Sequence, residues 1–143
     1  DAKGEPVTHL DTGRSYALCL RVRFHADVAR PIYGLTVKTP DGIEVAGSNS
    51  RDAAPLPAFV ARHAGDDVVV RHDFRCDLNA GEYLLSVGVA ADADGEVVPL
   101  ERRYDSIHVT VLNTRKVFGV VDLSIRTSEA DTEVAPALAQ VAD

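Results

Sequence analysis

The feature that most constrains the fold is a turn between two alternating apolar segments. Residues 31–49 read Pro31-Ile-Tyr-Gly-Leu-Thr-Val-Lys-Thr-Pro-Asp41-Gly42-Ile-Glu-Val-Ala-Gly-Ser-Asn49. Asp-Gly between alternating apolar residues is the strongest short-range signal for a β-hairpin, because both residues tolerate the positive φ angles of tight turns. We therefore expect antiparallel strands over Ile32–Thr39 and Ile43–Gly47.

The rest of the chain repeats this pattern of short alternating strands separated by turn residues. The further strands that it predicts are Arg14–His25, Val68–Leu78, Glu82–Ala91, Val97–Arg103, Tyr104–Leu112 and Val117–Arg126. About eight such strands are typical of an all-β, antiparallel β-sandwich of the immunoglobulin-like or jelly-roll kind. We place the sandwich at residues 1–127. Residues 128–143 are acidic and alanine-rich, and we expect a disordered or marginally helical tail there.

The charge of the chain argues against one class of partner. The chain has 143 residues, 45% of them apolar, and a net charge of −7. This length suffices for one domain with a buried core. Nucleic-acid binding needs a basic surface that neutralises phosphates, so we expect no nucleic-acid partner.

The two cysteines are predicted to stay reduced. In the first long strand, Cys19 is out of phase with the apolar set that begins at Tyr16, whereas Cys76 is in phase with the apolar Phe74. Side chains on opposite faces rarely meet the distance that a disulfide demands. Reduced thiols fit a cytosolic compartment.

The sequence lacks the common catalytic motifs, so we expect neither an enzyme nor a cofactor. It has no glycine-rich phosphate loop, nucleophile elbow, His-Glu-x-x-His or Cys-x-x-Cys motif. Asp92-Ala-Asp94-Gly95-Glu96 resembles the opening of a calcium loop. However, Arg103 stands where the bidentate glutamate would be needed. We therefore interpret this segment as a hairpin turn and predict no metal site.

Two histidines that could suggest chemistry have simpler interpretations. His72 shares the inward phase of Phe74, which predicts a half-buried histidine with its hydrogen bonds satisfied. Asp105 and His108 are three residues apart, and an odd separation in a strand places side chains on opposite faces. We therefore expect no acid–base pair between them.

The last predicted strand breaks the alternation rule. From Val117 to Ile125 both faces carry apolar side chains, which indicates either a locally covered strand or a contact between two copies of the chain. The candidate dimer-interface residues are Val117, Phe118, Val120, Val121 and Leu123.

The solvent-facing positions of the strands suggest a carbohydrate surface. If several strands share one sheet, its outer face carries planar donors, hydroxyl groups and the aromatic Tyr104, which suit hydroxyl pairs and the C–H faces of sugars. Exposed strand positions are polar in any sandwich, so a purely structural face is the alternative. The candidate carbohydrate-binding residues are Arg21, Arg23, Thr36, Lys38, Arg75, Ser86 and His108.

Three segments together resemble a known family. They are Pro31–Asn49, the run Leu78-Asn-Ala-Gly81-Glu-Tyr83-Leu-Leu-Ser-Val-Gly-Val89, and the run Val117-Phe-Gly-Val-Val-Asp-Leu123. Their order and spacing are similar to the C-terminal domain of Wzt-type ATP-binding subunits, which belong to ABC transporters that export O-antigen polysaccharide. The resemblance covers about Glu5 to Ile125.

This resemblance implies a non-catalytic, carbohydrate-binding β-sandwich that recognises O-antigen polysaccharide for export. It further implies a homodimer that exchanges C-terminal strands. The membrane transporter complex would be reached through a separate ATPase domain at the cytoplasmic face of the bacterial inner membrane. Two alternatives stay open: an immunoglobulin-like structural or protein-interaction module, and the same glycan-binding module attached to a glycan-modifying enzyme. A jelly-roll hydrolase would need paired carboxylates facing one cleft, and the sequence shows no such pair.

Overall fold

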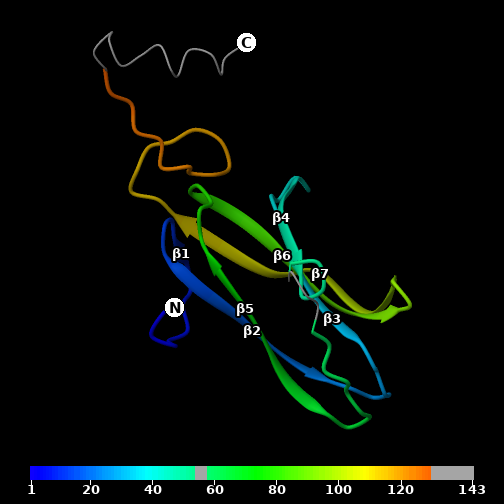
Figure 1. The fold of residues 1–143 in the computed structure, drawn as a ribbon. Helices are drawn as coiled ribbons and strands as arrows, with labels where there is room; N and C mark the ends of the chain where they lie inside the picture. The colour runs from blue at the N-terminus through cyan, green and yellow to red at the C-terminus, as the bar shows by residue number, and fades with distance from the viewer. Residues whose placement is uncertain (54–57, 130–143) are drawn as a thin grey trace, which may run out of the picture.

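The chain folds into two β-sheets that face each other (Figure 1). The computed structural model describes residues 1–53 and 58–129, and these residues contain strands but no helix. The strands are β1 (Leu10–Asp11), β2 (Ser15–Arg23), β3 (Pro31–Lys38), β4 (Glu44–Asn49), β5 (Asp67–Arg75), β6 (Gly81–Ala93) and β7 (Glu96–Leu112). The prediction of an all-β sandwich is confirmed.

The two sheets differ in size. Within the described residues, one is five-stranded with the order β1-β7-β6-β3-β4, and the other consists of β2 and β5. All pairs are antiparallel except β1 with β7, in which Leu10 lies opposite Val111. The expectation of a purely antiparallel sandwich is therefore wrong at this edge. The short β1 reaches β7 from the far end of the chain, so no hairpin turn sets its direction.

Both hairpins that were predicted from turn residues are present. Between β3 and β4, the Gly42 N–H donates to the carbonyl oxygen of Thr39 at 2.9 Å, and Gly42 has a φ of 91°. Between β6 and β7, Asp94 and Gly95 have φ angles of 53° and 94°. Positive φ at both central residues matches the right-handed twist of the flanking strands. The interpretation of this second segment as a hairpin turn agrees with the structure.

The strands differ from the prediction in three places, and the first is the short β1, which was not predicted. The expected pair Val97–Arg103 and Tyr104–Leu112 is one strand, the 17-residue β7, because a bulge lets its pairing with β6 continue across both. The expected strand Val117–Arg126 is absent: only Val121 pairs, in an isolated bridge with Leu78. Of its apolar residues, Val120 packs against the core, whereas Phe118, Leu123 and Ile125 are exposed.

The core lies between the sheets, nearest the β1 end. Tyr16, Tyr83, Cys76 and Val111 are buried in it, and the rings of Tyr16 and Phe74 lie 6.3 Å apart. The Tyr16 hydroxyl accepts the backbone N–H of Asp11 at 2.7 Å. The burial of Tyr16 and Cys76 confirms the phase read from the sequence.

Both cysteines are free, as predicted. Cys19 is exposed and Cys76 is buried. Burial raises the pKa of the Cys76 thiol above its ordinary value. His72 is half-buried as expected, but its Nε2 atom is buried and has no hydrogen-bond partner among the described residues. The prediction that its hydrogen bonds would be satisfied is therefore wrong.

The predicted tail, residues 128–143, lies almost entirely outside the described residues, so the boundary at 127 stays a prediction. Within the described residues, no helix has the length and apolar character needed to cross a membrane.

Candidate functional site: the outer face of the five-stranded sheet

Part of the predicted carbohydrate-binding set comes together on the outer face of the five-stranded sheet. These residues are Thr36, Lys38, Ser86 and His108. Leu85 on β6 is buried, so its neighbour Ser86 points to the opposite side of the sheet. Ser86 lies directly across from Thr36 on β3, and Leu84 lies between Lys38 and His108. Three strands therefore contribute polar groups to one surface.

A bulge in β7 places an acidic group at the centre of this surface. Leu85 pairs with Ile107 and Val87 pairs with Arg103, so Ser86 faces an irregular segment of β7. Within it, Asp105 has a φ of 51°. The left-handed region is costly for residues with a Cβ, and such strained residues concentrate at functional sites.

Asp105 is held in place by its neighbours on β3 and β6. Its backbone N–H donates to the Ser86 Oγ at 2.9 Å, and its Oδ1 lies 2.8 Å from the Lys38 Nζ and 3.3 Å from the Ser86 Oγ. These contacts put Asp105 on the same side of the sheet as His108. The prediction that the two residues lie on opposite faces is wrong, because the bulge breaks the alternation between them.

The neighbouring polar groups form a second small network. His108 Nε2 lies 2.7 Å from Glu82 Oε2, and the Thr110 hydroxyl donates to the same oxygen at 3.0 Å. Both side chains of the His108–Glu82 pair are about half exposed, so they remain accessible to a ligand. Hydroxyl, carboxylate and imidazole groups thus lie beside one another along β6 and β7.

An exposed aromatic ring borders the same bulge. Tyr104 is 67% exposed, and its hydroxyl accepts from Arg102 Nη1 at 3.1 Å. Gly88 lies opposite Gly34 in the register of β6 and β3, so neither strand presents a side chain there. A Cβ added at Gly88 would lie 3.2 Å from the carbonyl oxygen of Glu101. An exposed ring beside a stretch of sheet without side chains is suited to stacking against a flat molecule.

The other predicted carbohydrate-binding residues lie on the second sheet. Arg21, Arg23 and Arg75 are exposed on the outer face of β2 and β5. Arg21 makes a two-bond contact with Asp67, with N···O distances of 3.1 and 2.8 Å, and this contact lowers the pKa of the Asp67 carboxyl. Arg75 lies 2.9 Å from Asp77. The seven residues therefore do not form one surface, since they occupy the outer faces of two sheets.

Sequence reasoning missed three residues of the first surface: Glu82, Arg102 and Asp105. Asp105 was missed because we assumed strict alternation along Tyr104–Leu112, which places it on the opposite face from His108. A bulge has no reliable signal in a single sequence. Glu82 was identifiable in principle, since it is a charged residue next to the buried Tyr83. Arg102 had no such signal, since its neighbours Glu101 and Arg103 are charged and exposed as well.

The predicted dimer-interface residues lie in an irregular segment after β7. Phe118 is 100% exposed, Leu123 is 74% exposed and Val121 is 41% exposed. Val120 packs against the core, and the carbonyl oxygen of Val117 accepts from Asn79 Nδ2 at 3.1 Å. Thus this segment exposes much of its apolar surface.

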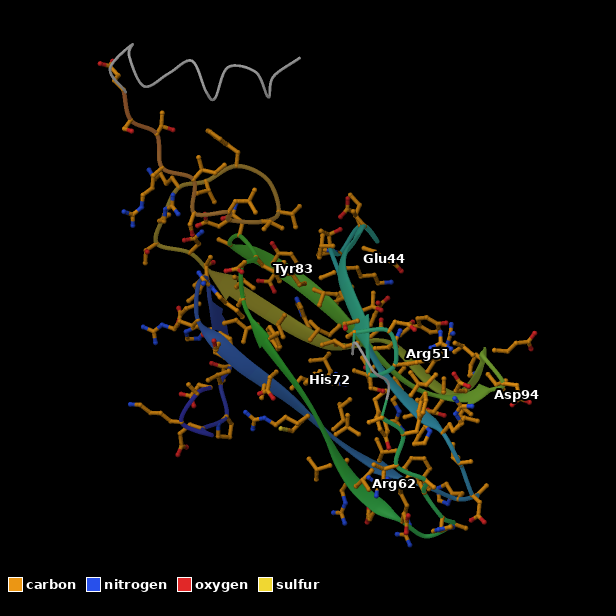
Figure 2. All side chains as sticks on the ribbon, viewed as in Figure 1. Glu44, Arg51, Arg62, His72, Tyr83 and Asp94 are labelled. Carbon is orange, nitrogen blue, oxygen red and sulfur yellow. The ribbon has the colours of Figure 1, made fainter. Side chains whose placement is uncertain are left out.

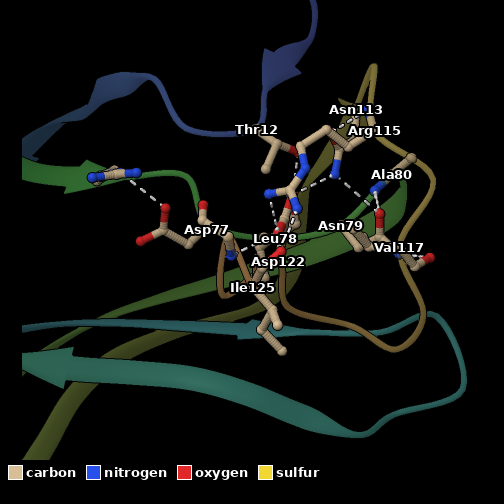
Figure 3. A network of polar contacts seen from close by, with 12 residues as sticks. Thr12, Asp77, Leu78, Asn79, Ala80, Asn113, Arg115, Val117, Asp122 and Ile125 are labelled. Carbon is tan, nitrogen blue, oxygen red and sulfur yellow. Dashed lines mark hydrogen bonds and ion pairs between the residues drawn. The ribbon is translucent and has the colours of Figure 1, made fainter. Parts of the chain in front are cut away.

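A buried carboxylate anchors that segment (Figure 3). Asp122 is 5% exposed; it accepts from Asn113 Nδ2 at 3.1 Å, from Arg115 Nη1 at 3.1 Å and from the Ser124 N–H at 2.8 Å. The Asn113 hydrogen bond is the main cause of a lowered pKa at Asp122, and the Ser124 N–H and the Arg115 charge add to it.

An open groove of about 600 Å³ lies between the sheets on the side of β4 and β5. Apolar side chains from both sheets line it, among them Leu35, Val37, Phe74 and Val109. His72 also lines it from β5 (Figure 2). The described residues contain no group of three or more histidine, cysteine, aspartate or glutamate side chains placed to hold a metal ion.

Comparison with known proteins identifies the family. A sequence model described as the Wzt C-terminal domain matches residues 1–123. The chain is similar to a solved structure titled "Crystal structure of the C-terminal domain of wzt", with 32% identity, a TM-score of 0.80, and coverage of 85% of this chain and 74% of that one. No curated protein matches the chain. The family match spans most of the chain and the structural match supports it, so the chain belongs to the Wzt C-terminal domain family.

Proposed function

We propose that this domain recognises O-antigen polysaccharide for export by an ABC transporter, and that it binds the glycan on the outer face of the five-stranded sheet. Membership of the Wzt C-terminal domain family supports a carbohydrate-binding, non-catalytic role in O-antigen export. The position of the glycan on the protein is inferred from the chemistry of that face.

The observation that carries the proposed site is the Asp105 bulge. A carboxylate in the left-handed region lies at the centre of the face, within contact distance of the Lys38 ammonium and the Ser86 hydroxyl. An acceptor beside a donor matches two neighbouring sugar hydroxyls, and charge-assisted hydrogen bonds are the stronger kind. The Tyr104 ring is placed to stack on the C–H face of an adjoining sugar.

The binding experiment uses two glycans and three variants. Affinity electrophoresis compares retention by the O-polysaccharide of the source cell with retention by an unrelated O-polysaccharide. Retention by the first alone is expected, with loss in Tyr104→Ala and Lys38→Ala. Arg75→Ala, on the other sheet, is the matched control and should bind as the wild type does.

Two other results would change the proposed glycan site or the proposed function. Loss in Arg75→Ala alone would move the site to the two-stranded sheet. Absence of retention by either glycan would favour the alternative of a structural or protein-interaction module.

We further propose a homodimer, formed through the segment from Val117 to Leu123. The exposure of Phe118 and Leu123 supports this contact, since large apolar side chains gathered on a surface mark an interaction site. Two glycan sites per dimer would raise the avidity for a repeating polymer. Truncation before Val117 should give a monomer or insoluble protein by light scattering, and an unaltered soluble dimer would contradict the proposal.

The cellular setting is proposed from the family alone. A full-length parent chain would carry an ATP-binding domain and would work at the cytoplasmic face of the inner membrane. The sequence encoded upstream of Asp1 tests this directly. A phosphate-binding loop there would support the transporter, whereas a glycan-modifying enzyme would assign the same module to another system.

A further inference from the structure

Arg102 lies on the same outer face of the five-stranded sheet as the proposed glycan site. It pairs with Gly88 in the register of β6 and β7, and Gly88 lies two residues beyond Ser86, on the same side of β6. A Cβ added at Gly88 would lie 3.7 Å from the Arg102 Cγ. The aliphatic part of the arginine therefore runs across the outer face of the sheet beside Gly88.

The guanidinium group of Arg102 is held at one end and open at the other. Its Nη1 donates to the Tyr104 hydroxyl at 3.1 Å, and both side chains are exposed. An arginine has five N–H donors in a fixed planar arrangement. Within the described residues, no other hydrogen bond or ion pair involves this guanidinium group. Its Nε and Nη2 donors, which point in the same direction, are therefore open to a ligand.

Two other basic side chains of this face already have acidic partners. The Lys38 Nζ lies 2.8 Å from the Asp105 Oδ1, and the His108 Nε2 lies 2.7 Å from the Glu82 Oε2. Arg102 differs from both, because no carboxylate of the described chain lies within ion-pair distance of it. The face therefore presents one cation whose charge is not matched by a neighbour.

An unmatched guanidinium group in this position indicates an acidic ligand group. The chain has a net charge of −7, so an acidic polymer is repelled by the molecule as a whole and needs a local cation to bind. Arginine binds carboxylate and phosphate oxygens through two parallel N–H donors. Neutral sugar hydroxyls need no such charge, and the paired Lys38 and Asp105 already suit them.

We infer that Arg102 binds an oxyanion of the glycan, and that the polysaccharide recognised by this domain is therefore acidic. The inference rests on the proposed function, because it names the class of glycan that the outer face binds. Gly88 and Ser86 are two residues apart, about 7 Å along the strand. The oxyanion therefore belongs to a sugar next to the one that contacts Lys38 and Asp105. Uronic acid carboxylates and phosphate esters share this chemistry, and the test separates them.

The first measurement compares three forms of the O-polysaccharide of the source cell: native, carboxyl-reduced, and freed of phosphate esters by mild hydrofluoric acid. The wild-type domain should bind the native form about tenfold more tightly than one of the treated forms. Weaker binding after carboxyl reduction would identify a carboxylate, and weaker binding after phosphate removal would identify a phosphate ester. Equal binding of all three forms would overturn the acidic class and leave the proposed function in place. Absence of binding to every form would overturn the proposed function itself.

The second measurement assigns the oxyanion to Arg102. Arg102→Gln should weaken binding of the native glycan about tenfold and leave binding of the neutralised form unchanged, because the lost contact exists only with the charged form. Arg102→Lys keeps the charge but not the paired donors, so it should recover part of the affinity. An equal loss with both forms of the glycan would show that Arg102 binds a neutral hydroxyl group, and would overturn the inference.

Arg103→Gln is the matched control. Arg103 is the neighbouring residue and is also exposed, but alternation turns it to the other side of β7, where its Nε lies 3.3 Å from the Glu101 Oε1. The variant changes the net charge by the same amount as Arg102→Gln. It should keep the tenfold preference for the native glycan. The same loss in both variants would reduce the effect to general charge and would overturn the assignment to Arg102.

The Tyr104 hydroxyl has its own test. Tyr104→Phe keeps the ring and removes the acceptor that holds the Arg102 Nη1. It should weaken binding of the native glycan about threefold and leave binding of the neutralised form unchanged. A loss of the same size with both forms would show that the hydroxyl contacts a sugar directly, and would contradict its role in holding Arg102.

Discussion

Replacing Asp105 by glycine should separate the role of this residue in binding from its role in stability. The left-handed conformation costs an L-residue about 1–2 kcal/mol, and glycine removes that cost. Glycine in turn costs about 0.4–1 kcal/mol through the entropy of the unfolded chain. The lost ion pair joins a Lys38 side chain that is 23% exposed to an Asp105 side chain that is 39% exposed. A partly exposed pair of this kind is worth about 0.2–1 kcal/mol.

These terms oppose one another, and the hydrogen bond from the residue 105 N–H to Ser86 Oγ is retained in glycine. We therefore expect Asp105→Gly to unfold in urea within about 1 kcal/mol of the wild type. Asp105→Ala keeps the strain and should be the less stable variant. Polysaccharide affinity should fall about tenfold or more in both, because a charged hydrogen-bond acceptor is lost.

The measurements are urea denaturation with a fixed m-value and titration with the cognate polysaccharide. Wild-type affinity in Asp105→Gly would refute the proposed site. A loss of more than about 3 kcal/mol would show that the residue is structural, since no term above is that large. Asp73→Ala, which removes the exposed carboxylate paired with Arg71 on the other sheet, is the control for general charge effects.

Three further predictions concern the stability of the domain. Gly88→Ala should destabilise the domain by about 1 kcal/mol in urea denaturation, because its Cβ would lie 3.2 Å from the carbonyl oxygen of Glu101. A stabilised variant would show that the backbone of β7 shifts to accommodate the methyl group. Because the pKa of Asp122 is lowered in the folded state, its contribution to the free energy of unfolding is fully present above its unfolded pKa and is lost as the pH falls through the lower folded value. Asp122→Asn should therefore reduce the fall in stability at acidic pH. An unchanged fall would contradict this. Tyr83→Phe should cost about 1–2 kcal/mol in thermal or urea unfolding, because the buried hydroxyl donates to the Asn79 oxygen at 2.8 Å; a neutral result would mean that another group satisfies that oxygen.

Local sequence patterns predicted most of the fold. They did not predict strand pairing between residues that are distant in the sequence. Asp41-Gly42 and Asp94-Gly95 marked the turns correctly, because the φ angles of a tight turn depend on the residues that form it. Alternation also assigned the inward Tyr16 and Cys76. The parallel contact between Leu10 and Val111 had no local signal, since the partner lies a hundred residues away.

The candidate site was predicted only in part for the same reason. Thr36, Lys38, Ser86 and His108 were identified from alternation, and the register of β3, β6 and β7 brings them together. Arg21 was indistinguishable from them in sequence, although it lies on the other sheet. Which strands share a sheet is a property of the assembled fold, and alternation alone reports only which side of its own strand a residue occupies.

The sequence by itself determined the turns, the inward phases, the apolar last segment and the family resemblance, all of which depend on nearby residues or on their order. Only the tertiary structure decided that Asp105 faces the same way as His108. Only it showed that, among the described residues, His72 Nε2 has no hydrogen-bond partner and no strand pairs with the second edge of β5. A bulge, a buried polar atom and an uncovered edge each arise where segments distant in sequence meet, so they become visible when the strands are packed together.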